Sequence, residues 1–176
     1  MIDLSRNHFQ LFGLAPAFRI DGDALDRAFR ALQAEVHPDR FAAAPDADRR
    51  MALQGSARVN EAYRTLKDPV ERARYLLSLR GIDAFDERDT ALPLDFLEAQ
   101  LERRENASQA ADAEDIEALE RVLADVRAEV QERQQELAGL LDDTARADEA
   151  KSRVRELRFL AKVAEDVNAM LGALDA

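Results

Sequence analysis

Apolar residues recur every three or four positions along most of the chain, the spacing that places them on one face of a helix. Between Asp21 and Pro38 this apolar stripe consists of Leu25, Phe29, Leu32 and Val36. Asp21 is a favourable residue to cap the start of such a helix. Pro38 disfavours helical backbone at His37, so we expect the helix to end at about Val36.

Three other segments of the first half have helical patterns. NHFQLFGL predicts a short apolar helix that ends at Gly13. After a loop, FAAAPDAD, a longer helix is predicted, with periodic positions at Leu53, Ala57, Asn60 and Tyr63 and with Val59 and Leu66 nearby. Asp68 and Pro69 are typical of the start of a further helix, VERARYLLSLRG, which Gly81 should end. The residues predicted to lie in the core are Phe29, Leu53, Tyr63 and Leu66.

The second half begins with IDAFDERDTALP, which contains turn residues and no sustained period, so it is predicted to be a linker. Three helices follow, from about Leu94 to Asn106, from about Ile116 to Leu137, and around a stripe from Val154 to Val167. Helices with one apolar stripe must bury it against each other, so we predict an elongated three-helix bundle. The predicted all-α architecture has three parts: an N-terminal helical domain (1–76), a helix end and linker (77–92) and the C-terminal bundle (93–176).

Composition supports helices and excludes several classes of site. The chain is 47% hydrophobic and 35% charged, with only 6 Gly and 5 Pro, and it has no Cys. Disulfides, thiolate metal sites and cysteine nucleophiles are therefore excluded. No apolar run approaches the ~20 residues that span a bilayer, and the amino terminus, MIDLSRNHFQLFG, lacks the features of a signal peptide or presequence. We expect a soluble cytoplasmic protein.

The net charge of −11 is unevenly distributed. Residues 1–75 contain 12 Lys/Arg and 11 Asp/Glu, whereas residues 76–176 contain 13 Lys/Arg and 25 Asp/Glu. Because binding to nucleic acids and anionic membranes depends on positive charge, the acidic half disfavours both kinds of partner. The split also suggests two modules with different partners.

The sequence offers little for catalysis. His37 and Asp39 are two residues apart, so a helix would not place them on one face, and His8 is the only other histidine. No complete set of metal ligands and neither of the nucleophile motifs G-x-S-x-G and S-x-x-K is present. The six glycines are scattered singly, so no phosphate-binding loop is predicted. We therefore expect neither an enzyme nor a bound cofactor or metal.

His37, Pro38 and Asp39 fit two interpretations. In a recognition tip, Pro38 would fix the backbone and lower the entropy that a partner's binding costs. His37 would offer ring donors and acceptors, Asp39 a carboxylate, and Arg27 and Arg30 on the preceding helix would add positive charge. In a plain polar turn, the same residues would only close a helical hairpin. The tripeptide alone favours the plain turn, because three residues recur by chance.

The surrounding sequence changes this weighting. HFQLFGL, LDRAFRALQAEVHPDRF and VNEAYRTLKDPVERARYLL, in this order over residues 7–76, resemble the J-domain, the module of DnaJ-type co-chaperones. In that family, His-Pro-Asp contacts a DnaK-class ATPase chaperone and is required to stimulate its ATP hydrolysis. The resemblance implies this chaperone-binding role for His37, Pro38 and Asp39, with electrostatic support from Arg27, Arg30 and Arg40.

The rest of the chain narrows the resemblance. RA-x-YLL-x-x-x-G, FL-x-x-QLE-x-RE and KSRVRELRFLAKV follow in order, and an acidic helical region stands where a DnaJ has a Gly/Phe-rich linker and a cysteine region. This arrangement is similar to that of the HscB family, the J-type co-chaperones of iron–sulfur cluster assembly. It implies two partners, the DnaK-class chaperone HscA and the scaffold IscU on which the cluster is built. The family recruits the scaffold, presents it to the chaperone and promotes cluster transfer to acceptor proteins.

By the same resemblance, the scaffold-binding face maps onto Leu97, Leu101, Glu102, Glu105 and Phe159. Leu97, Leu101 and Glu105 are four residues apart in turn, so a helix would place them on one face. Glu98 stands where the family often has Met, and Gln109 where it often has Glu, so we expect a less apolar face. Pattern alone leaves Leu101 and Phe159 open as core residues, and Glu102 and Glu105 as ordinary surface acids.

Two alternatives stay open. The chain is either a J-domain co-chaperone for a different client or a helical scaffolding protein in which the histidine loop is inert. We expect a monomer, although exposed leucines on the bundle leave self-association open.

Overall fold

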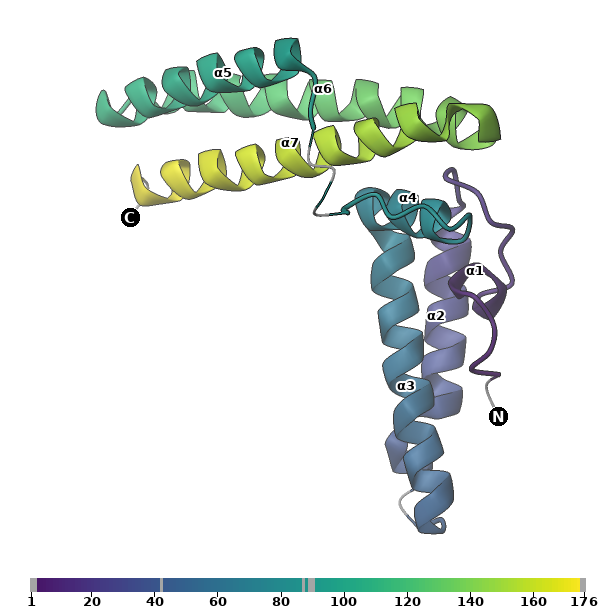
Figure 1. Ribbon diagram of the computed structural model, residues 1–176. Helices are drawn as coiled ribbons and strands as arrows, with labels where there is room; N and C mark the ends of the chain where they lie inside the picture. Colours follow the sequence, from purple (N-terminus) through teal and green to yellow (C-terminus); the bar gives the residue numbers. More distant parts are fainter. Residues whose placement is uncertain (1–2, 42, 87, 89–90, 175–176) are drawn as a thin grey trace. The chain divides into compact units, whose positions relative to one another are not determined.

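The computed structural model describes residues 3–41, 43–86, 88 and 91–174, and these residues form helices without any strand (Figure 1). The predicted all-α fold is confirmed. The chain divides into two compact units, Met1–Leu76 and Leu77–Ala176. Ala42 of the predicted loop and residues 87, 89 and 90 of the predicted linker lie outside the described residues. No helix in the described part combines the length and the apolar character that crossing a bilayer requires.

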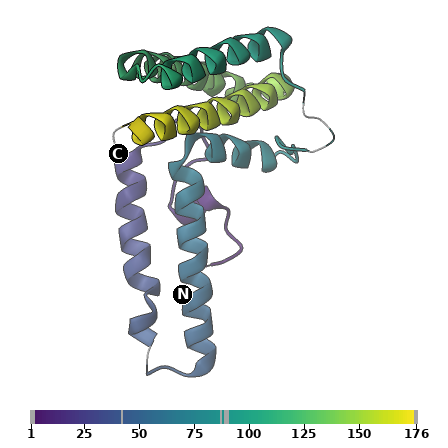
Figure 2. The same cartoon turned by 90° about the vertical axis from the view of Figure 1, so that its left-hand side faces the viewer.

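The first unit is built on a hairpin of two long helices, α2 (Gly22–Val36) and α3 (Asp46–Lys67), which lie side by side (Figures 1 and 2). The 3-10 helix η1 (Pro38–Phe41) lies between them in the chain. A short helix, α1 (His8–Leu11), packs against α3, and α4 (Pro69–Ser78) follows α3. The main buried side chains of this unit are Phe9, Leu25, Val36, Val59, Ala62 and Leu66.

Local signals set the helix ends largely as predicted. The side chains of Asp21 and Asp68 accept hydrogen bonds from backbone N–H groups in the first turns of α2 and α4. Gly13 and Gly81 lie just beyond α1 and α4 with φ angles of 67° and 78°. Because this left-handed conformation is strained for residues with a Cβ, glycine is favoured at both ends. The helix α3 begins at Asp46, inside the predicted loop.

The prediction that Leu53 is a core residue is wrong, since its side chain is 57% exposed. The neighbouring face of α3 is buried instead, and its residues are Ala52, Gly55, Val59, Ala62 and Leu66. Small side chains suit this face because α2 approaches closely. A Cβ added at Gly55 would lie only 3.3 Å from Cγ1 of Val36.

Phe29 and Tyr63 lie at the edge of the core and join α2 to α3. Both are half-buried, and their rings stack with centroids 3.9 Å apart. The Tyr63 hydroxyl donates a hydrogen bond to Asp26 at 3.0 Å, and the Lys67 ammonium donates to the same carboxylate at 2.7 Å. These bonds, from Lys67 first and then from Tyr63, lower the pKa of Asp26. The hairpin is thus fastened at the end opposite η1.

His8 is buried in the first unit. It is 4% exposed, and its ring stacks on Tyr75 with centroids 4.1 Å apart. Within the described residues, neither ring nitrogen has a hydrogen-bond partner. Burial, and then the positive charge of Arg58, lower the pKa of His8, and Glu61 opposes them only in part. The fold therefore accommodates the neutral imidazole.

The second unit is a bundle of α5 (Leu94–Asp112), α6 (Ile116–Asp142) and α7 (Ala147–Leu174), with a 3-10 turn, η2 (Thr144–Arg146), before α7. Its central buried cluster consists of Phe96, Ala107, Ala110, Leu119, Leu123, Val126, Leu160, Val163 and Val167. The helix α5 runs six residues beyond its predicted end because its last turns bury small alanines, which give little apolar signal. Ala84 is also fully buried, and its carbonyl oxygen accepts a 2.7 Å hydrogen bond from Arg155.

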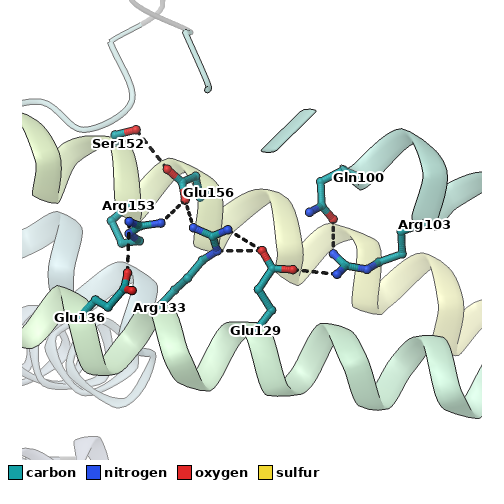
Figure 3. Close-up of polar contacts among 8 residues, drawn as sticks. All are labelled: Gln100, Arg103, Glu129, Arg133, Glu136, Ser152, Arg153 and Glu156. Carbon is teal, nitrogen blue, oxygen red and sulfur yellow. Dashed lines mark hydrogen bonds and ion pairs between the residues drawn. The ribbon is translucent and has the colours of Figure 1, made fainter. Parts of the chain in front are cut away.

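A row of alternating charges, which we call the ion ladder, links the three helices of the bundle (Figure 3). Arg103 of α5 lies 2.8 Å from a carboxylate oxygen of Glu129 on α6. Arg133, one turn further along α6, donates to Glu129 at 2.6 Å and also binds Glu156 of α7. Arg153 donates to the same Glu156 at 2.6 Å. Glu156 is only 3% exposed, and these two guanidinium groups are the partners that its buried carboxylate requires.

The ion ladder helps to hold α5, a helix that buries few large apolar side chains. Burial alone would raise the pKa of Glu129, but hydrogen bonds from Arg133 and Arg103 outweigh it and hold that pKa below its ordinary value. The carbonyl oxygen of Gln100, a residue 1% exposed, accepts from Arg103 at 2.5 Å. The inner side of α5 is therefore fixed by polar contacts together with Phe96, Ala107 and Ala110, and its outer side is left to solvent.

We expect the first unit to lose stability as the pH falls below about 6.5, the ordinary pKa of histidine. Because the folded-state pKa of His8 is lowered, the unfolded chain binds the proton first, and acid favours unfolding. Both tyrosines, Tyr63 and Tyr75, belong to this unit, so tyrosine fluorescence follows its unfolding alone. Between about pH 7.5 and 5.5, the melting midpoint should fall more in the wild type than in His8→Phe. Equal falls in both proteins would contradict the role of His8.

We expect Glu156→Ala to lower the free energy of unfolding of the bundle by about 2–3 kcal/mol, because Arg133 and Arg153 lose a buried partner. Urea denaturation followed by circular dichroism measures the change. The control is Glu165→Ala on the same helix, which removes an exposed partner of Lys162 and should cost at most about 0.5 kcal/mol. A cost for Glu156→Ala no greater than the control's would show that the ion ladder adds nothing.

Candidate functional site

The segment His37–Arg40, here called the tip, follows the last residue of α2. His37 has φ −57° and ψ 127°, outside the helical region. The cause is Pro38, because a proline disfavours helical backbone at the preceding residue. For Pro38 itself the structure describes the backbone, which begins the 3-10 helix η1. The predicted helix end is thus found where the proline requires it.

The side chains of His37 and Asp39 point to solvent. They are 52% and 90% exposed. Nδ1 of His37 accepts a hydrogen bond from the backbone N–H of Asp39 at 3.3 Å and lies 3.5 Å from its carboxylate. This contact orients the imidazole while much of both side chains remains exposed. A partner can therefore reach both groups.

Arg40 ties the tip to the helix before it. Its guanidinium donates a 3.1 Å hydrogen bond to the carbonyl oxygen of Ala34, and its backbone N–H donates to the carbonyl oxygen of His37 at 3.0 Å. The last carbonyls of a helix lack partners within it, and this arginine supplies a hydrogen-bond donor to one of them at the end of α2. Arg40 is nevertheless exposed, and its charge lies beside Asp39 in the chain.

Arg27 and Arg30 lie on the exposed face of α2, opposite the stripe that contains Leu25. Arg27 lies 3.9 Å from Asp21, a contact between two well-exposed groups that gives little stability. Both arginines are thus displayed to solvent on the helix that leads into the tip.

The structure also shows a groove that the sequence did not indicate. Its volume is about 370 Å³, and its lining includes Val36, Arg40, Phe41 and Met51 beside the tip. Because the lining comes from α2, η1, α3 and the segment before α1, no local pattern predicts it.

On the bundle, most of the predicted scaffold-binding residues of α5 lie on its exposed side. Leu101 is 68% exposed, and Glu102 and Glu105 are exposed. Leu97 is half-buried and packs against the central cluster. The pattern of the sequence left open that Leu101 is a core residue. Its exposure shows that it is not.

Phe159 of α7 is half-buried at the junction of α5 and α7. Its ring contacts Phe96 edge-to-face with centroids 5.7 Å apart, and the Arg104 guanidinium lies 5.8 Å from its centroid. Arg104 is fixed in turn by Asp166 at 3.3 Å. Phe159 thus has a packing role at the contact between α7 and α5, the helix that contains Leu97 and Leu101.

Leu94 is a residue that the sequence did not single out. It is 71% exposed and is the first residue of α5, seven positions before Leu101. The signal that could have indicated Leu94 is its distance of seven residues from Leu101, because residues seven apart lie on nearly the same side of a helix.

Two family profiles match the chain. The DnaJ domain matches residues 7–75, and the HSCB C-terminal oligomerisation domain matches residues 92–168. The first match contains the tip, and the second contains all of the predicted scaffold-binding residues.

Curated relatives match over nearly the full length. The co-chaperone protein HscB homologues of Paraburkholderia phymatum and Burkholderia multivorans are each 48% identical over 175 residues, which cover 99% of both chains. Among solved structures, chaperone HscB from Vibrio cholerae is 39% identical with a TM-score of 0.85 over 96% of this chain and 99% of that one. Human co-chaperone protein HscB is 28% identical with a TM-score of 0.88, over 95% and 83% of the two chains. The chain therefore belongs to the HscB family of J-domain co-chaperones.

Proposed function

We propose that this protein stimulates the ATPase of a DnaK-class chaperone of the HscA type and delivers to it an iron–sulfur scaffold of the IscU type. It would thereby promote the maturation of iron–sulfur proteins in the cytoplasm without being an enzyme itself. The observation that carries the proposal is the exposure of His37 and Asp39 at a proline-fixed bend, in a chain of a co-chaperone family.

The geometry of the tip suits docking to a second protein. Pro38 and the contact of His37 with the Asp39 backbone restrict the segment before binding, so less entropy is lost on association. The Asp39 carboxylate is almost fully exposed and is a ligand for a partner's arginine. Arg27, Arg30 and Arg40 would steer the tip towards an acidic surface of the chaperone.

Stimulation of hydrolysis requires that the tip bind one conformation of the chaperone better than another. A ligand shifts such an equilibrium only by its differential affinity for the two states. We assign this differential contact to His37, Pro38 and Asp39. The contact need not be tight, because the co-chaperone must dissociate for the next cycle.

The bundle would bring the client to the same place. Leu97, Leu101 and Phe159 offer apolar area on α5 and at its junction with α7, and Glu102 and Glu105 add negative charge. Binding the scaffold here would raise its effective concentration near the chaperone, so two weak contacts would act together.

We expect His37→Gln to abolish ATPase stimulation, because glutamine lacks the ring nitrogens of the imidazole. The helical circular dichroism and the melting midpoint should not change, since the His37 side chain is half exposed. The measurement is the steady-state ATP hydrolysis rate of a purified HscA-type chaperone with added co-chaperone.

Arg64→Gln is the control, because Arg64 is an exposed residue near the end of α3 opposite the tip. It should retain full stimulation. Undiminished stimulation by His37→Gln would overturn the assignment of the tip.

We expect Leu101→Ala to weaken scaffold binding by roughly tenfold, the loss that follows when an exposed leucine no longer becomes buried at an interface. Helicity should be unaffected, whereas Phe159→Ala should also lower stability because it removes the contact with Phe96. Calorimetric titration with a purified IscU-type scaffold measures the change.

Leu79→Ala removes another exposed leucine of the same unit, 44% exposed, and should leave binding unchanged. If the wild-type protein stimulated the ATPase normally but did not bind the scaffold, its client would be a different protein.

A further inference from the structure

The two most exposed large apolar side chains in the described residues belong to one helix. They are Leu94 and Leu101 of α5, at 71% and 68%. Seven residues correspond to nearly two full turns, so the two leucines lie on almost the same line, about 10 Å apart along the axis. A single exposed leucine is ordinary on a protein surface, but two aligned on one helix are the pattern of a contact ridge.

The backbone around Leu94 is anchored, although its side chain is exposed. It follows Pro93, whose carbonyl oxygen accepts a hydrogen bond from the backbone N–H of Leu97 at 3.1 Å. On either side, Leu92 and Phe96 pack in the central cluster of the bundle. The leucine therefore projects from an anchored turn, so that binding would have to order only its side chain and not the backbone.

The carboxylates beside this line are not neutralised. Glu98 and Glu102 are exposed and form no ion pair with any described residue. Glu105 accepts a 3.4 Å hydrogen bond from the amide of Gln109, which is uncharged. On the inner side of the bundle, by contrast, arginines bind Glu129 and Glu156. The outer side of α5 thus combines apolar area with free negative charge.

We propose that Leu94 is a further contact residue of the scaffold-binding surface, which extends from Leu101 two turns back to the start of α5. This rests on the proposed function. The matching surface on the scaffold is an apolar patch bordered by lysine or arginine side chains, because those cations complement Glu98, Glu102 and Glu105. The scaffold-binding residues that the family resemblance implies begin at Leu97. With Leu94 included, the proposed contact surface on α5 is about one helical turn longer.

The test is calorimetric titration of the full-length protein with a purified IscU-type scaffold. Leu94→Ala should raise Kd by at least about fivefold, and Leu94→Met, which keeps the apolar area, should bind within about twofold of the wild type. Ile116→Ala is the matched control, since Ile116 is also an exposed first residue of a helix in the same unit, 40% exposed. It should not change Kd.

The charge component is tested by the salt dependence of Kd. Glu98→Gln should reduce the weakening of binding that added salt causes, because one screened ion pair is removed. A Kd for Leu94→Ala equal to that of the wild type, while Leu101→Ala binds weakly, would overturn this inference alone. Failure of the wild type to bind the scaffold would overturn the proposed function and this inference with it.

Discussion

The backbone restriction that Pro38 imposes on His37 sets the geometry of the tip. Because a proline disfavours helical backbone before it, α2 ends at Val36 and the chain enters η1. His37 and Asp39 are thereby placed outside the hairpin core, with their polar groups facing solvent. The close packing of α3 on α2, which Gly55 permits, holds this bend at the end of a rigid pair of helices.

In the second unit, the division of polar groups between the two sides of α5 has a comparable effect. Arg103, Glu129, Arg133 and Glu156 satisfy one another inside the bundle, so the buried charges are paired. The outer side of α5 is left with exposed leucines and free carboxylates. Such a mixed surface would suit the proposed holding and release of a client, because charge gives specificity and rate while a small apolar area limits affinity.

Much of this arrangement follows from local rules in the sequence. The caps at Asp21 and Asp68, the end of α2 and the all-α fold are each set by a few neighbouring residues. Leu53 was misplaced because two adjacent faces of α3 both have helical period, and the buried one consists largely of small residues whose apolar signal is weak. Leu94 was passed over because it stands at a predicted helix start. The ion ladder joins residues from three helices, and no spacing within one segment predicts such contacts.

The most direct measurement is the ATP hydrolysis rate of an HscA-type chaperone with this protein alone, with the scaffold alone, and with both. If the tip engages the chaperone and the bundle presents the client, this protein alone should raise the hydrolysis rate. This protein and the scaffold together should raise the hydrolysis rate by more than the sum of their separate effects. A rate that this protein leaves unchanged, with or without the scaffold, would contradict the account.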